Sequence, residues 1–289
     1  RANKEAIALQ LAQAKKNFEV GTTTITDTYE AQSRFDLAVA QELAGESDLE
    51  VRRYALRVIV GGEVGELSRL RTDVELLPPQ PANMERWAQA AESDNFPVQA
   101  RQAAFEVAQQ EVERMRAGHY PTLDVVANYG RNDSLASATT GGSLQTDTRN
   151  IGLQLSIPIY EGGAVNSKVR EAIANRSAAR SLLENSRRVA VLDARQSFLG
   201  VVNGLARIQA LEAALVSGIS ALEANRLGYD VGVRINIDVL DAEQQVYVTR
   251  RDLARARFDT LLAQLELKAA VGTLDEDDLA RIGPLFELP

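Results

Sequence analysis

The chain has 289 residues, of which 45% are hydrophobic and 25% charged, a balance that predicts a folded protein rather than a disordered one. The formal net charge of −8 disfavours nucleic acid as a partner, because the phosphate backbone selects basic proteins. No cysteine is present, which excludes disulfides, thiolate metal sites and cysteine nucleophiles. Only 5% of the residues are aromatic, and a composition rich in Ala, Leu, Gln, Glu and Arg favours long helices. No run of 18 apolar residues occurs, so we expect no transmembrane helix.

The first 61 residues predict a helical hairpin. Residues 1–18 have the pattern of the end of a helix, a turn follows at Gly21, and a second helix is expected from about Thr26 to Val60, where Gly61 provides a glycine C-cap. The chain opens within helical sequence and no cap precedes it. We therefore expect that an N-terminal part of the protein lies outside this sequence.

The next region, 62–121, is less regular. Its proline-rich segment 77–81 interrupts any helix, because proline lacks the backbone N–H donor. Short helices are expected at about 83–93 and 97–117.

Residues 122–158 change to a two-residue period and predict a β-hairpin. Within 122–131 and again within 149–158, apolar residues alternate with small or polar ones, and a polar loop spans 132–148. The pattern fits a half-buried hairpin on a soluble core. It also fits a membrane β-barrel hairpin with an apolar face toward lipid and a polar face toward the lumen. Periodicity alone leaves both interpretations open.

A very long helix is expected from about Ala164 to Leu227. At about 1.5 Å per residue it extends roughly 95 Å, beyond the dimensions of a compact domain. Its apolar residues repeat every seven positions, as in a coiled-coil seam: Val201, Ile208, Leu215 and Leu222. The helix after it carries two adjacent apolar rows, which begin at Val239 and Leu240. Such a helix is expected to contact neighbours on two sides, although an ordinary core also accommodates a wide stripe.

The turns of the two helical hairpins are repeats of one another. Residues 18–27 and 229–238 share the pattern aromatic-x-Val-Gly-x4-(Ile/Thr)-Asp, and the same spacing relates Gly61 to Gly272. An ungapped register of this length indicates two copies of one rigid unit.

Several phrases, in one order along the chain, resemble the TolC family of outer-membrane channels. They are the two turn motifs at 20–27 and 231–242, GHYPTL at 118–123, IPIYEGG at 157–163 and LKAAVGTL at 267–274. The resemblance implies a mainly α fold in which long antiparallel coiled-coil hairpins form a periplasmic α-barrel. It also implies a β-hairpin that contributes to a transmembrane β-barrel shared by a homotrimer.

The resemblance assigns each region a place in that architecture. The implied domains are 1–61, the helical hairpin of the first repeat; 62–121, an equatorial region with short helices; 122–158, the transmembrane β-hairpin; 159–274, the long helical hairpin of the second repeat; and 275–289, a C-terminal equatorial segment. Only one of the family's two strand pairs is present, so the chain resembles a fragment that lacks the N-terminal part.

The function implied is an exit duct in the cell outer membrane, with a helical extension into the periplasm, for protein secretion or drug efflux. Its implied partners are outer-membrane lipid, a periplasmic adaptor and an inner-membrane transporter, with no cofactor. A periplasmic adaptor is one alternative, but adaptors flank a single hairpin with β-rich halves. A purely structural coiled-coil protein is another, and the strand pair with its exit at Tyr160-Glu161-Gly162-Gly163 disfavours it.

Asp238 and Asp241 are the first candidate site residues. They lie three apart, on one face of the first turn of a helix. Acidic residues at a helix N-terminus are favourable without any further role. The resemblance implies instead that they line a narrow entrance, where a trimer would bring six carboxylates together and favour cations.

The resemblance also implies a gate. Tyr229 and Arg234 flank the second turn, Thr26 and Asp27 flank the first, and residues at these positions are implied to bond one another and hold the entrance closed. An ordinary exposed salt bridge would equally explain Arg234.

Gln10 matches another gate position, but the acidic partner expected there is replaced by Arg226. Contact with the adaptor is implied for the hairpin tips, at Val20, Gly21, Val231 and Gly232.

No catalytic or metal site is predicted. His119 is the only histidine and has no partner for a triad or metal cluster. The acidic run 275–278 lacks the ligand spacing and central glycine of a calcium loop, and we interpret it as a solvated helix start. We therefore expect that the protein is not an enzyme.

Overall fold

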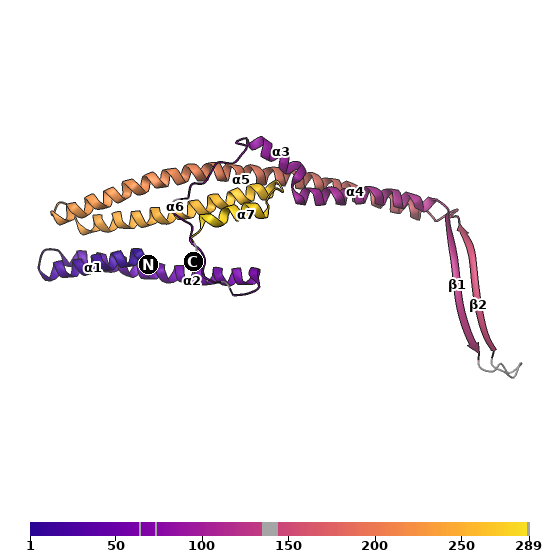
Figure 1. The fold of residues 1–289 in the computed structure, drawn as a ribbon, viewed down its shortest axis with the longest axis horizontal. Helices are drawn as coiled ribbons and strands as arrows, with labels where there is room; N and C mark the ends of the chain where they lie inside the picture. Colours follow the sequence, from indigo (N-terminus) through magenta and orange to yellow (C-terminus); the bar gives the residue numbers. More distant parts are fainter. Residues whose placement is uncertain (64, 73, 135–143, 288–289) are drawn as a thin grey trace. The chain divides into compact units, whose positions relative to one another are not determined.

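The computed structural model describes residues 1–63, 65–72, 74–134 and 144–287. Its elements are α1 (Ala2–Glu19), α2 (Ile25–Val60), α3 (Met84–Asp94), α4 (Phe96–Arg116), β1 (Thr122–Ser134), β2 (Leu144–Ser156), α5 (Ala164–Asp230), α6 (Asn236–Ala270) and α7 (Glu276–Ile282), with single 3-10 turns after α4 and α7 (Figure 1). Two compact units are formed, one by Arg1–Ala91 with Val191–Pro289 and the other by Glu92–Ala190. The mainly helical fold with long hairpins and one β-hairpin is thereby confirmed.

The turns between α1 and α2 and between α5 and α6 have the same backbone conformation. Gly21 and Gly232 have φ angles of 78° and 79°, in the left-handed region that only glycine enters without strain. The N–H of Thr22 donates to the Asn17 carbonyl at 2.9 Å, and the matching N–H of Val233 donates to the Gly228 carbonyl at 2.8 Å. The sequence repeat is therefore a structural repeat.

The helices that follow these turns begin differently. Thr24 caps α2, because its hydroxyl accepts the N–H of Asp27 at 3.4 Å while the Asp27 carboxylate accepts the N–H of Thr24 at 3.1 Å. The matching residue before α6 is Ile235, which has no side chain able to cap. The first turn of α6 contains Asp238 instead, whose charge favours the positive end of the helix dipole.

Helix α6 contacts helices on two sides, as its two apolar rows predict. Val239 and Val246 pack with Leu222 of α5. The neighbouring Leu240 packs in a separate cluster built by α1 and α2, whose other buried members are Ile7, Leu11, Ala14, Ala31 and Ala38. Burial on both sides fixes α6 between α5 and the first hairpin, and the beginning of α6 lies beside the first turn.

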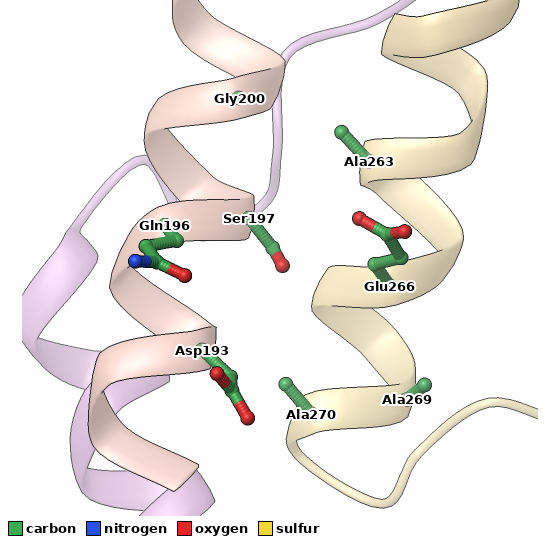
Figure 2. Close-up of a pocket in the computed structure, with 8 residues that line it drawn as sticks. All are labelled: Asp193, Gln196, Ser197, Gly200, Ala263, Glu266, Ala269 and Ala270. Carbon is green, nitrogen blue, oxygen red and sulfur yellow. The ribbon is translucent and has the colours of Figure 1, made fainter. Parts of the chain in front are cut away.

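Glycines on α5 allow a close approach to α6. Gly200 lies opposite Ala263 in a groove that is also lined by Asp193, Ser197 and Glu266 (Figure 2). One turn further along α5, a Cβ on Gly204 would lie 2.2 Å from the Thr260 hydroxyl oxygen and 3.1 Å from the Thr260 Cβ. Thr260 is fully buried, so it has little room to move away.

Gly204→Ala is expected to destabilise this hairpin by about 1–2 kcal/mol, because the overpacking penalty exceeds the gain in helix propensity. Thermal unfolding of the full-length protein should show a lower Tm. Gly218→Ala is the matched control on α5, since its Cβ would lie 3.6 Å from Val246 Cγ2, an ordinary contact. The control should be neutral or slightly stabilising, and equal Tm values for the two variants would contradict the packing argument.

Strands β1 and β2 form one antiparallel hairpin in which apolar residues share a face. Leu123 is opposite Leu155, Val125 opposite Leu153 and Ala127 opposite Ile151, while the intervening pairs include Asp124 with Gln154 and Asn128 with Asn150. The described side chains on both faces are exposed, except that Val126 is partly buried. No soluble core covers the described part of the hairpin, which disfavours the interpretation as a half-buried hairpin on a core.

The strands extend further into the polar segment than the alternation predicted. β1 continues to Ser134 and β2 begins at Leu144 rather than at 149, whereas β2 ends at Ser156, before Pro158. Cross-strand pairing explains the extension, because Arg131 bonds the Asp147 directly opposite it at 2.9 Å. The remainder of the predicted loop, 135–143, lies outside the described residues.

The interpretation of the acidic run 275–278 as solvated was wrong for one residue. Asp275 caps α7 as expected, with a capping box to Asp278, but Asp278 is buried and bonded to Lys268 of α6. The Lys268 ammonium lowers the pKa of the Asp278 carboxyl. The run therefore fastens the C-terminal segment to α6.

One helix meets a looser criterion for a membrane span than the unbroken apolar run considered in the sequence. An 18-residue window of α5 has a mean hydropathy of 1.3, so α5 is long and apolar enough to cross a membrane by length and composition alone. A windowed mean tolerates isolated polar residues, whereas a search for an unbroken apolar run does not. Only 11% of this window is buried within the chain, which leaves most of its apolar surface available to neighbouring molecules.

Candidate functional site

A groove runs between the tips of the two helical hairpins. It brings three of the predicted gate residues together, Asp27 from the first hairpin with Tyr229 and Arg234 from the second. The remaining lining residues are Gln13, Asn17, Thr22, Thr23, Thr24, Asp230, Gly232, Ile235 and Asn236. The side chains are mostly polar, as expected for a surface whose contacts form and break in water.

Tyr229 joins the two hairpins directly. Its hydroxyl oxygen accepts a hydrogen bond from the Asn17 side-chain amide at 3.1 Å. Asn17 was missed by the sequence analysis. Asn17 occupies the position that matches Gly228 at the second tip, so the repeat gives no signal of its bond to Tyr229.

Gly228 itself makes room for Arg234. A Cβ on Gly228 would lie only 2.6 Å from Arg234 Cγ, so the aliphatic part of Arg234 crosses directly over the glycine. The Arg234 guanidinium then lies 3.6 Å from the Asp238 carboxylate on the first turn of α6. The arginine therefore reaches from the turn to one of the two predicted entrance aspartates.

The other predicted gate residues are placed differently. The Asp27 carboxylate accepts hydrogen bonds from the backbone N–H and from the hydroxyl of Thr24, each at 3.1 Å. Thr26 is exposed next to it. In the part of this chain that the structure describes, Asp27 bonds neither Tyr229 nor Arg234, although all three line the same groove. The bonds that the resemblance implied among them stay a prediction for the assembled protein.

Both predicted entrance aspartates have an arginine beside them. Asp238 lies next to Arg234, and Asp241 accepts a bond of 2.5 Å from Arg34 of α2. The second pair crosses from the first repeat to the second. Arg34 was also missed by the sequence analysis, because nothing in the local pattern relates it to a residue 207 positions away.

Arg226 is bonded to Glu243 instead of Gln10. The Arg226 guanidinium donates to Glu243 Oε1 at 2.9 Å, and Glu243 is only 2% exposed. Among the described residues the second carboxylate oxygen of Glu243 has no hydrogen-bond partner. Burial raises the pKa of the Glu243 carboxyl, and the Arg226 guanidinium opposes this only in part. Arg226, at the predicted gate position, thus has an acidic partner on its own hairpin.

The tip residues predicted to contact an adaptor are well placed for a protein contact. Val20 and Val231 are exposed, and each precedes the left-handed glycine of its turn. His119 is exposed and lies 3.3 Å from the Asn166 side chain. Within the described ranges, no group of three or more metal-ligating side chains occurs.

Comparisons with known proteins place this arrangement in a family. The sequence profile described as "Outer membrane efflux protein" matches residues 87–273. The outer membrane protein TolC of Escherichia coli is 36% identical over 298 residues, covering 100% of this chain and 60% of that protein. The proteases secretion protein PrtF of Dickeya chrysanthemi is 31% identical and is covered to 62%, with 99% of this chain aligned. The chain therefore spans about three fifths of the length of these relatives.

Solved structures show the same fold. The outer membrane protein VceC of Vibrio cholerae superposes with a TM-score of 0.75 at 19% identity, over 94% of this chain and 64% of that chain. The CmeC outer membrane channel of Campylobacter jejuni gives a TM-score of 0.76 at 17% identity, over 98% of this chain and 62% of that chain. Since the family profile covers well over half of its residues, the chain belongs to the outer membrane efflux protein family, as its resemblance to TolC implied.

Proposed function

We propose that this chain forms part of a homotrimeric exit duct in the cell outer membrane, a transport protein rather than an enzyme. The observation that carries the proposal is the β1–β2 hairpin, which has one apolar and one mostly polar face, both exposed, in a chain of the outer membrane efflux protein family. A strand pair of this kind needs lipid on one side and water on the other. The proposal places the hairpin in the shared barrel and the helical hairpins in a periplasmic α-barrel.

The cargo can be of two kinds. Relatives of this chain are named for protease secretion, such as PrtF of Dickeya chrysanthemi and AprF of Pseudomonas aeruginosa, and for efflux, such as BepC of Brucella suis. We propose that cargo is delivered by an inner-membrane transporter acting through a periplasmic adaptor. The exposed tips at Val20 and Val231 are the surface proposed for the adaptor.

The groove between the tips is proposed to be the periplasmic gate. Its support is the meeting of Asp27, Tyr229 and Arg234 on one surface, with Tyr229 held to Asn17. Asp238 and Asp241 are proposed to face the axis of the trimer, where their carboxylates favour the passage of cations. Thr26, which is exposed on the first tip, is also proposed to belong to the gate. Gln10 is proposed to make the weakest contact of the gate, because Arg226 is bonded to Glu243.

Site-directed spin labels on the hairpin test the membrane assignment. Labels introduced singly at Leu153 and Gln154 of the full-length trimer, reconstituted in lipid, should differ in accessibility because the two side chains project from opposite faces. The label at 153 should be reached by oxygen dissolved in lipid, and the label at 154 by a water-soluble nickel reagent. Val125 and Asp124, directly opposite, provide a matched pair. Equal lipid accessibility at all four positions, or trimers that do not conduct in planar bilayers, would contradict the proposal.

A further inference from the structure

We propose that Arg34 sets the cation affinity of the periplasmic entrance by acting as a built-in counter-ion for Asp241. The inference rests on the proposed function, since it concerns the acidic entrance of the duct. It assigns a selectivity-determining role to a residue on the first helical hairpin, whereas both aspartates of the entrance lie on the second.

The position of Arg34 is held by the packing beneath it. Ala31 and Ala38 lie on the same side of α2 as Arg34, three and four residues away, and both are buried against a cluster that includes Leu240. Leu240 immediately precedes Asp241. The apolar contact of α2 with α6 therefore brings the guanidinium to the carboxylate, and the two groups meet at 2.5 Å.

The charges at the entrance are consequently balanced within each protomer. Asp238 lies 3.6 Å from Arg234, and Asp241 is bonded to Arg34, so two carboxylates are accompanied by two guanidinium groups. A ring of unpaired carboxylates would concentrate multivalent cations strongly. Three copies of Arg34 in a trimer would cancel half of the acidic charge and reduce that attraction.

Asp241 is the aspartate whose availability depends most on Arg34. Its side chain is 58% exposed, compared with 34% for Asp238, so solvent cations can reach it once the arginine is removed. The Arg34 side chain is itself 38% exposed, and exposed pairs contribute little to stability. Its removal is therefore expected to change cation binding far more than folding.

The second repeat carries an amide at the position that matches Arg34. The residue that matches Arg34 on α6 is Gln245, whose side chain bonds Thr249 on its own helix at 3.3 Å. Arg34→Gln is thus a mild substitution that removes one positive charge per protomer. Arg255→Gln provides a matched control, because Arg255 is an exposed arginine further along α6, 3.6 Å from Asp259.

The test is calorimetric titration of La³⁺ into full-length trimers in detergent, which requires no conduction. Arg34→Gln should raise the La³⁺ affinity by about tenfold, because three positive charges leave the ring. Asp241→Asn should lower the affinity, the double variant should resemble Asp241→Asn, and Arg255→Gln should resemble the wild type. Opposite signs for the two single variants are the signature of a counter-ion.

Two results would overturn the inference. One is an unchanged affinity in Arg34→Gln, and the other is a change in the same direction in Arg34→Gln and Asp241→Asn, as expected if the pair were only a structural bond between the hairpins. Failure of the proposed function is recognised separately, by the spin-label accessibilities and by the conductance of the wild-type trimer. Wild-type trimers that conduct, with La³⁺ affinity insensitive to Arg34, would reject the role of Arg34 alone.

Discussion

Arg226→Ala is expected to destabilise the second helical hairpin by about 1–3 kcal/mol at pH 8. The substitution leaves the carboxylate of Glu243 buried at 2% exposure without its guanidinium partner. Breaking a fully buried ion pair costs about 3–5 kcal/mol. The destabilisation expected here is smaller because the Arg226 side chain is 49% exposed. Thermal unfolding of full-length trimers should show a lower Tm.

The loss should depend on pH in one direction. Burial already raises the pKa of Glu243, and removal of Arg226 raises it further. The penalty for the charged carboxylate is therefore present above the raised folded-state pKa and disappears as the pH falls through it toward the unfolded-state value of about 4.3. The Tm difference from the wild type should narrow on acidification.

Neutral variants of Glu243 separate charge from shape. Glu243→Gln keeps the volume without the charge, and it should leave the Tm unchanged or raise it, because burial disfavours the charged form. Combined with Arg226→Ala, it should recover most of the loss. A Tm gap that widens at acidic pH, or a double variant as unstable as Arg226→Ala, would refute this account.

The double variant Tyr229→Phe with Arg234→Ser is expected to favour the open state of the entrance. The first change removes the bond from Asn17, and the second removes the arginine that crosses Gly228 and reaches Asp238. Two such links contribute about 1–2 kcal/mol, which corresponds to roughly a tenfold change in the open population. Single-channel recording of full-length trimers in planar bilayers should show higher mean conductance.

A matched pair further along α6 controls for the loss of the same chemical groups. Tyr247→Phe with Arg250→Ser removes a hydroxyl and a guanidinium whose ring contact is 5.8 Å, away from the groove. This control should conduct as the wild type does. Asn17→Ala should reproduce part of the effect of Tyr229→Phe. Unchanged conductance in the double tip variant would remove Tyr229 and Arg234 from the gate.

Local sequence was sufficient for the helices, their turns and the faces of the β-hairpin, but not for the full length of the strands. Gly21 and Gly232 are required by left-handed backbone angles, and the alternation in 122–131 and 149–158 correctly predicted which side chains share a face of the hairpin. These features depend on neighbours a few residues away, which the sequence displays directly. The same holds for the length of α5, since an uninterrupted helical pattern needs no distant partner to be recognised.

Partners that meet across the fold were decided only by the tertiary structure. Asn17 reaches Tyr229 across 212 positions of sequence, and Arg34 reaches Asp241 across 207. The burial of Glu243 and Asp278 was also unforeseen, because a carboxylate on a helix is expected in solvent until packing places a cation beside it. Periodicity defines the faces of a helix, but the contact between two helices determines which side chains on those faces meet. For that reason the amino-acid sequence by itself identified the hairpins, the repeat and the family resemblance, whereas the pairing of Asp238 and Asp241 with arginines followed from the packing of α6 against both α2 and α5.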